Sequence, residues 1–106
     1  MFGGMDLGKL MKQAQEMQRK MEKVKEDLRD RVVEASAGGA VVVHFTGAQE
    51  MLDIQIKPEV LKEEASVLQD LVVAAVNEGI KKAKALAEQE MGKVAGGLGG
   101  LPGMGL

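Results

Sequence analysis

The chain has 106 residues, the size of one small domain, and a formal net charge of −2, which excludes a uniformly basic protein. It has no cysteine, so disulfides, zinc knuckles and thiol catalysis are excluded, and its single histidine completes neither a triad nor a metal site. With two Phe and no Trp or Tyr, the core must be built from aliphatic residues and Met. Because such a core is small, we expect folding to be completed by a two-fold homodimer.

The first predicted element is an amphipathic helix from Asp6 to Arg31, with Asp6 as its N-cap, after a flexible leader at Met1–Met5. Three heptads place apolar residues at the a and d positions: Leu7, Leu10, Ala14, Met17, Met21, Val24 and Leu28. The helix would be about 35–40 Å long, more than a core of this size covers. The stripe is either the face that packs on the chain's own sheet or a face that also contacts a neighbouring subunit.

Cationic side chains gather on the side of this helix opposite the apolar stripe. They are Lys9, Lys12, Arg19, Lys20 and Lys23, with only Glu16 of opposite sign among them. Two interpretations fit: the cations keep an amphipathic helix soluble, or each contacts a phosphate of a nucleic acid. Because the chain has almost no aromatic residues to stack on unpaired bases, duplex DNA is the preferred polyanion.

Three short segments with alternating apolar residues follow, at Val32–Ala37, Ala40–Thr46 and Met51–Lys57. The connections between them are short enough for hairpin turns, and the first contains Gly38-Gly39, so we expect an antiparallel meander. His44 lies in the middle segment. A histidine on a strand surface is most simply solvated or packed against a neighbour, and a role in binding or pH sensing is the alternative.

Pro58 ends the third strand, and a second long helix is predicted to begin at about Val60 or Leu61 and to run to about Val94. Within it, Leu71–Val76 is apolar on every side, so we expect this turn to lie between the chain's own sheet and a second subunit. Residues 1–95 are predicted to form one domain. Residues 96–106, rich in glycine and without charge, are predicted to be a disordered tail.

The order of helix, three strands and helix predicts a two-layer α+β fold, an α-β-β-β-α protomer with a three-stranded antiparallel sheet. Apolar residues of both helices are expected at the dimer interface: Met17, Met21, Val24, Leu28, Leu71, Val72, Val73 and Val76. No catalytic residue, metal, cofactor or small-molecule substrate is indicated, so an enzyme is disfavoured. No apolar run approaches the roughly 18–20 residues of a membrane span, so a cytoplasmic protein without membrane contact is expected.

Several segments of the chain occur together, and in the same order, in one known family. They are Met1–Gly4, Leu10–Gln18, Gly38-Gly39, Ile54–Glu59, Leu68–Glu78 and Met91-Gly92 with the tail. Together they closely resemble the YbaB/EbfC family of bacterial nucleoid-associated proteins over essentially the whole chain. The resemblance implies a tweezer-like homodimer that binds duplex DNA with weak or no sequence preference and organises the nucleoid or modulates expression. It also supports the first-helix cations as phosphate contacts.

Two positions depart from the family's pattern. Lys57 stands where an acidic residue commonly precedes the proline, and Glu78-Gly79 replaces a typical Asp-Ala. Gly79 is expected to cost the helix about 1 kcal/mol relative to Ala, and neither change touches the cations. The alternative function is a protein–protein adaptor that recruits another factor through its amphipathic helices, with incidental DNA contact.

Overall fold

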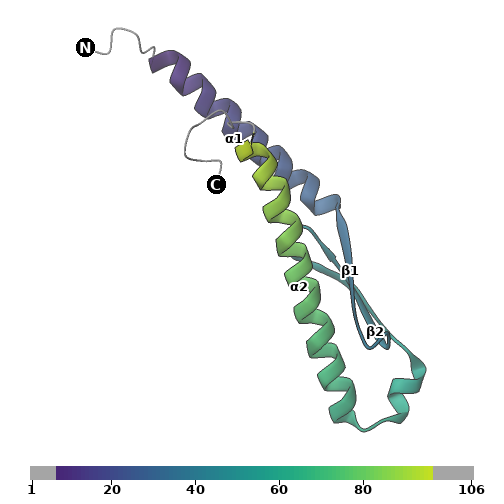
Figure 1. Ribbon diagram of the computed structural model, residues 1–106. Helices are drawn as coiled ribbons and strands as arrows, with labels where there is room; N and C mark the ends of the chain where they lie inside the picture. The colour runs from purple at the N-terminus through teal and green to yellow at the C-terminus, as the bar shows by residue number, and fades with distance from the viewer. Residues whose placement is uncertain (1–6, 97–106) are drawn as a thin grey trace.

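The computed structural model describes residues 7–96, and Figure 1 shows a small sheet with one long helix, α2, alongside it and a second, α1, extending beyond its end. The elements are α1 (Leu7–Asp30), β1 (Val32–Ala37), β2 (Val41–Thr46), β3 (Met51–Ile56), the 3-10 helix η1 (Pro58–Lys62) and α2 (Ala65–Gly96). The predicted α-β-β-β-α protomer is therefore confirmed. The leader, the proposed N-cap Asp6 and the tail from residue 97 onward lie outside the described residues.

The three strands form one antiparallel sheet in the order β1-β2-β3. In the central strand, Val43 pairs with Ala35 of β1 on one side and with Ile54 of β3 on the other. The turn between β1 and β2 uses Gly38 and Gly39 at φ values of +56° and +68°. Side chains rarely adopt this left-handed region, which explains the pair of glycines at the turn.

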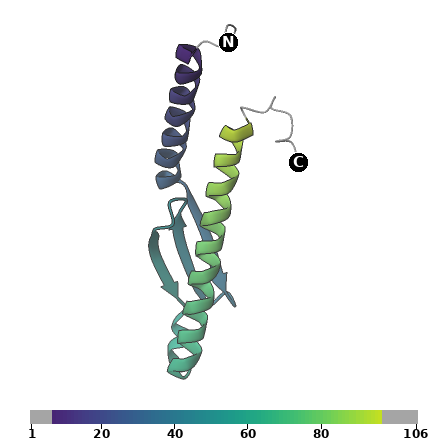
Figure 2. The ribbon, with the colours of Figure 1, turned by 90° about the vertical axis from the view of Figure 1, so that its left-hand side faces the viewer.

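α2 packs across β1 and β2 and leaves most of β3 uncovered (Figure 2). The core beneath it is built from small and aliphatic residues plus one Phe: Ala35, Ala37, Val41, Val43, Phe45, Ala75 and Ala83. At the closest approach, a Cβ added to Gly79 would lie 2.4 Å from Cε1 of Phe45. Gly79 therefore lowers helix propensity but lets α2 lie directly on the ring.

α2 begins at Ala65, so the predicted start at Val60 or Leu61 is wrong. Pro58 instead starts the 3-10 turn η1, in which Val60 is buried at 6% exposure. The amide of Glu63 donates to the carbonyl of Val60 at 3.0 Å, and Glu63 is extended at φ −83° and ψ 172°. The chain therefore turns once and straightens before the long helix starts.

The molecule is elongated, with extents of 74 × 26 × 15 Å and a radius of gyration of 20.7 Å. A compact chain of this length would have a radius of gyration of about 13 Å. Both views show α1 and α2 antiparallel, with the N-terminal part of α1 projecting past the end of α2 (Figures 1 and 2). Large apolar side chains consequently stay exposed, among them Leu7, Leu10, Met11, Leu52, Ile54, Val73 and Ile80.

Candidate nucleic-acid interface

The base of α1 is held against the β2–β3 turn. Leu28 is buried at 5% exposure, and a Cβ added to Gly47 would lie 2.7 Å from Cδ2 of Leu28. The amide of Gly47 also donates to the carbonyl of Arg31 at 2.9 Å. Toward the N-terminus, Leu7 and Leu10 are exposed at 72% and 43%. α1 is thus an arm fixed at its C-terminal end.

All five cations predicted as DNA contacts are exposed on this arm, and we call them the cationic arc: Lys9, Lys12, Arg19, Lys20 and Lys23. Within residues 7–96, none of the five forms an ion pair with another side chain. The arc extends about 21 Å along the helix axis at 1.5 Å per residue. It therefore presents a row of charges that an external anion can approach.

A groove of about 320 Å³ lies between the C-terminal half of α1 and the end of α2, and we call it the α1–α2 groove. Its apolar lining comes from Val24, Leu28 and Val94. Its charged lining consists of four cations and two acids: Lys20, Lys23, Arg31, Lys93, Asp27 and Glu90. Two members of the cationic arc therefore also belong to this groove.

Glu90 joins the two helices at the groove. Its Oε1 accepts a hydrogen bond from Nη1 of Arg31 at 2.7 Å, and its Oε2 lies 2.7 Å from Nζ of Lys93. Lys93 and then Arg31 lower the pKa of Glu90 below its usual value, which favours the ionised carboxylate. Sequence reasoning missed Arg31 and Lys93, because they belong together only once α1 and α2 are known to pack antiparallel.

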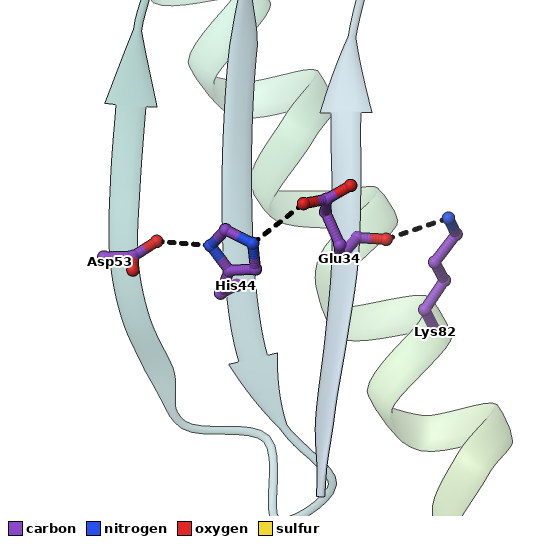
Figure 3. A network of polar contacts seen from close by, with 4 residues as sticks. All are labelled: Glu34, His44, Asp53 and Lys82. Carbon is purple, nitrogen blue, oxygen red and sulfur yellow. Dashed lines mark hydrogen bonds and ion pairs between the residues drawn. The ribbon is translucent and has the colours of Figure 1, made fainter.

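The face of the sheet away from α2 carries one histidine between two acids (Figure 3). The register aligns Glu34, His44 and Asp53 in one row across the three strands. Nδ1 of His44 lies 2.6 Å from Oδ1 of Asp53, and Nε2 lies 2.9 Å from Oε1 of Glu34. From α2, Nζ of Lys82 donates to the carbonyl of Glu34 at 2.9 Å. His44 is therefore packed against specific partners, which sequence reasoning did not find.

Hydrogen bonds to Asp53 and then to Glu34 raise the pKa of His44 above its ordinary 6.5. Only the protonated imidazole can donate to both carboxylates, whereas the neutral ring donates to one. The stability that this bridge contributes is therefore fully present below the unfolded pKa and is lost as pH rises through the folded pKa.

We expect the His44→Gln variant to lack this pH dependence. The melting temperatures of parent and variant should differ most near pH 6, and the gap should narrow toward about pH 9. Parallel thermal melts across this range would measure it. A gap that widens as pH rises would contradict the bridge.

Within residues 7–96, no group of three or more His, Asp or Glu side chains is placed to hold a metal ion. The two carboxylates beside His44 sit on opposite ring nitrogens, so they do not converge on one point. None of the described helices is long and apolar enough to cross a membrane.

The eight residues predicted at a dimer interface lie in different surroundings. Leu28 is buried within the protomer, and Met17 and Val24 are half-buried. Leu71, Val72 and Val76 are half-buried against the core. Met21 and Val73 are the most exposed, at 38% and 58%.

Comparison with known proteins gives this arrangement a family. The model of the YbaB/EbfC DNA-binding family matches residues 2–98. The chain belongs to this family. The resemblance found in the sequence is thereby confirmed, and the YbaB/EbfC family is a DNA-binding, nucleoid-associated family rather than an enzyme family.

Individual relatives agree over nearly their whole length. A nucleoid-associated protein of Ruminiclostridium cellulolyticum is 51% identical over 105 residues, covering 97% of this chain and 90% of the relative. One from Acetivibrio thermocellus is also 51% identical, covering 97% of this chain and 92% of the relative. The crystal structure of an uncharacterized Helicobacter pylori protein superposes with a TM-score of 0.77 at 25% identity, covering 87% of this chain and 99% of that one. This YbaB/EbfC member therefore shares both sequence and fold with its relatives.

Proposed function

We propose that this protein binds duplex DNA as a homodimer, through phosphate contacts of the cationic arc and with little sequence preference. The observation that carries the proposal is the arc itself, five exposed cations on a projecting arm that have no ion-pair partner within residues 7–96. Lys and Arg that contact phosphates position a protein on DNA without reading its bases. Membership of a DNA-binding family supports DNA as the polyanion.

The role that follows is organisation of the nucleoid or modulation of gene expression, in the cytoplasm where the nucleoid lies. The relatives from R. cellulolyticum and A. thermocellus bear the name nucleoid-associated protein, which supports this role. Binding that ignores sequence suits a protein that covers DNA broadly, because every duplex offers the same phosphates.

The homodimer that we propose uses an uncovered apolar corner between β3 and α2. Lys82 reaches β1 from α2, and Val73 and Ile80 lie on the opposite side of that helix, away from β1. Val73 and Ile80 are 58% and 39% exposed, and Leu52 and Ile54 of β3 are 53% and 37% exposed. We call these four residues the apolar corner. An isologous contact between two such corners would cover the edge that α2 leaves open.

Charge placed in the apolar corner is expected to break the dimer. Val73→Asp should raise the dimer dissociation constant at least about thirtyfold, since it buries an unpaired carboxylate at the interface. Sedimentation equilibrium would measure the change. The matched control is Val32→Asp, because Val32 is similarly exposed at 54% but lies outside the corner. Equal effects of the two variants would place the interface elsewhere.

A salt titration tests the DNA-binding function against the adaptor alternative. Five phosphate contacts per arm predict a slope of log K against log salt of about −4.5 for one arm and about −9 for two. Fluorescence anisotropy of a labelled duplex between about 50 and 200 mM salt would measure the slope. A flat dependence would favour the adaptor, for which the exposed Leu7, Leu10 and Met11 on the arm are the supporting observation.

A further inference from the structure

The α1–α2 groove combines an apolar lining with an excess of positive charge, which defines what can fill it. Four cations and two acids, Asp27 and Glu90, line it. Glu90 is already paired with Arg31 and Lys93, which leaves Lys20 and Lys23 as the cations without an ion-pair partner in the described chain. A suitable occupant carries an aliphatic side chain flanked by carboxylates.

The opposite end of the molecule has this composition. The turn at Pro58–Glu64, which we call the tip, joins β3 to α2 at the end of the molecule farthest from the N-terminus of α1 (Figure 1). Leu61 is 65% exposed there, and Val67 at the start of α2 is 39% exposed. Three exposed glutamates and one lysine surround Leu61 in sequence: Glu59, Glu63, Glu64 and Lys62.

The tip cannot reach the groove of its own chain. Between Glu64 and Glu90 the chain is helical from Ala65 onward, which separates the two by about 40 Å. We propose that the tip of one copy docks in the α1–α2 groove of a second copy, with Leu61 against Val24, Leu28 and Val94 and the glutamates near Lys20 and Lys23. The two surfaces differ and each copy carries one of each, so a head-to-tail repeat of this heterologous contact would join copies into rows.

The contact should be weak between free molecules, because exposed ion pairs contribute little and one leucine buries a small area. The contact should be stronger between copies that are already held next to one another, because their high effective concentration lowers the entropic cost of association. This inference adds self-association that does not depend on DNA. It shares Lys20 and Lys23 with the cationic arc, so the tip and DNA would compete for these two side chains.

The test uses charge reversal at both surfaces without DNA present. The tip variant carries Glu59→Lys, Glu63→Lys and Glu64→Lys, and the groove variant carries Lys20→Glu and Lys23→Glu. Sedimentation velocity at low salt over a range of concentrations would follow association beyond the dimer. The matched control for the groove is Lys9→Glu with Lys12→Glu, which changes the same charge on the same helix outside the groove.

The parent and the control should form species whose size increases with protein concentration. Each reversed variant should associate about tenfold more weakly. Mixing the two reversed variants should restore association, because each reversed surface then meets an opposite charge. A parent of constant size at every concentration, or a mixture that stays dissociated, would overturn the proposal. Association that needs the groove cations but not the tip glutamates would also overturn it, and would indicate another anionic occupant.

Discussion

Reversing four cations of the arm is expected to abolish detectable DNA binding while leaving the protein folded. The variant carries Lys12→Glu, Arg19→Glu, Lys20→Glu and Lys23→Glu. Losing four phosphate contacts should lower affinity at least about a hundredfold and flatten the salt slope by about 4 per arm. Because all four side chains are exposed, the reversal should not disturb the core. Gel retardation and circular dichroism on the same preparation would measure binding and folding.

The control variant has the same net charge as the arc-reversed variant, but its four reversed charges lie elsewhere on the molecule. Four exposed lysines outside α1 are replaced instead: Lys57→Glu, Lys62→Glu, Lys81→Glu and Lys84→Glu. If binding depends on the arc, the control should retain most of its affinity. An arc-reversed protein that retards DNA as well as the parent would show that the contact surface is elsewhere.

Replacing Gly79 by Ala is expected to destabilise the fold, although Ala is the better helix former. The new Cβ would lie 2.4 Å and 2.5 Å from Cε1 and Cδ1 of Phe45 and 3.0 Å from Cγ2 of Val43. Phe45 and Val43 are 3% and 0% exposed, so neither has room to withdraw. Overpacking of about 1–3 kcal/mol exceeds the gain of about 1 kcal/mol in helix propensity. We expect a net loss of up to about 2 kcal/mol, measured by urea unfolding.

Two further variants test whether contact with the Phe45 ring causes this loss of stability. A Cβ at Gly92, in the same helix, meets no atom within 4 Å, so Gly92→Ala should stabilise the protein by up to about 1 kcal/mol. In a Phe45→Leu background, Gly79→Ala should lose most of its cost, since the ring atoms that it meets are absent. A loss of stability that persists without the ring would refute the packing explanation.

Local pattern was enough to predict the elements because period-two and heptad spacing are properties of neighbouring residues. The strands at Val32–Ala37, Val41–Thr46 and Met51–Ile56 match the predicted segments to within one residue. The start of α2 was predicted too early because Leu61, Ala65 and Leu68 have the spacing of one helical stripe. Val60, at the predicted start, instead lies in η1. Its burial in a separate 3-10 turn depends on contacts that a periodic pattern does not contain.

The candidate site was predictable only where it lies on one element. The five cations of the arc share one helix, so their spacing alone brought them together. The partners of His44 depend on strand register, and the pairing of Arg31 with Glu90 joins positions 59 residues apart. The role of Gly79 also required the structure, because its reason lies in a ring on another strand.

α1 is held at its C-terminal end, so a small rotation there moves its N-terminal end by a large distance. Leu28 on Gly47 and Arg31 on Glu90 hold one end, while the other end is about 36 Å away. A rotation of about 5° at this pivot would swing the far end by about 3 Å, given that length. In the proposed dimer, the span between the two arms is therefore governed by contacts near Gly47 rather than by the charged residues. A substitution near Gly47 would therefore change the separation of the two arms, and with it the width of the duplex that fits between them, without replacing any cation.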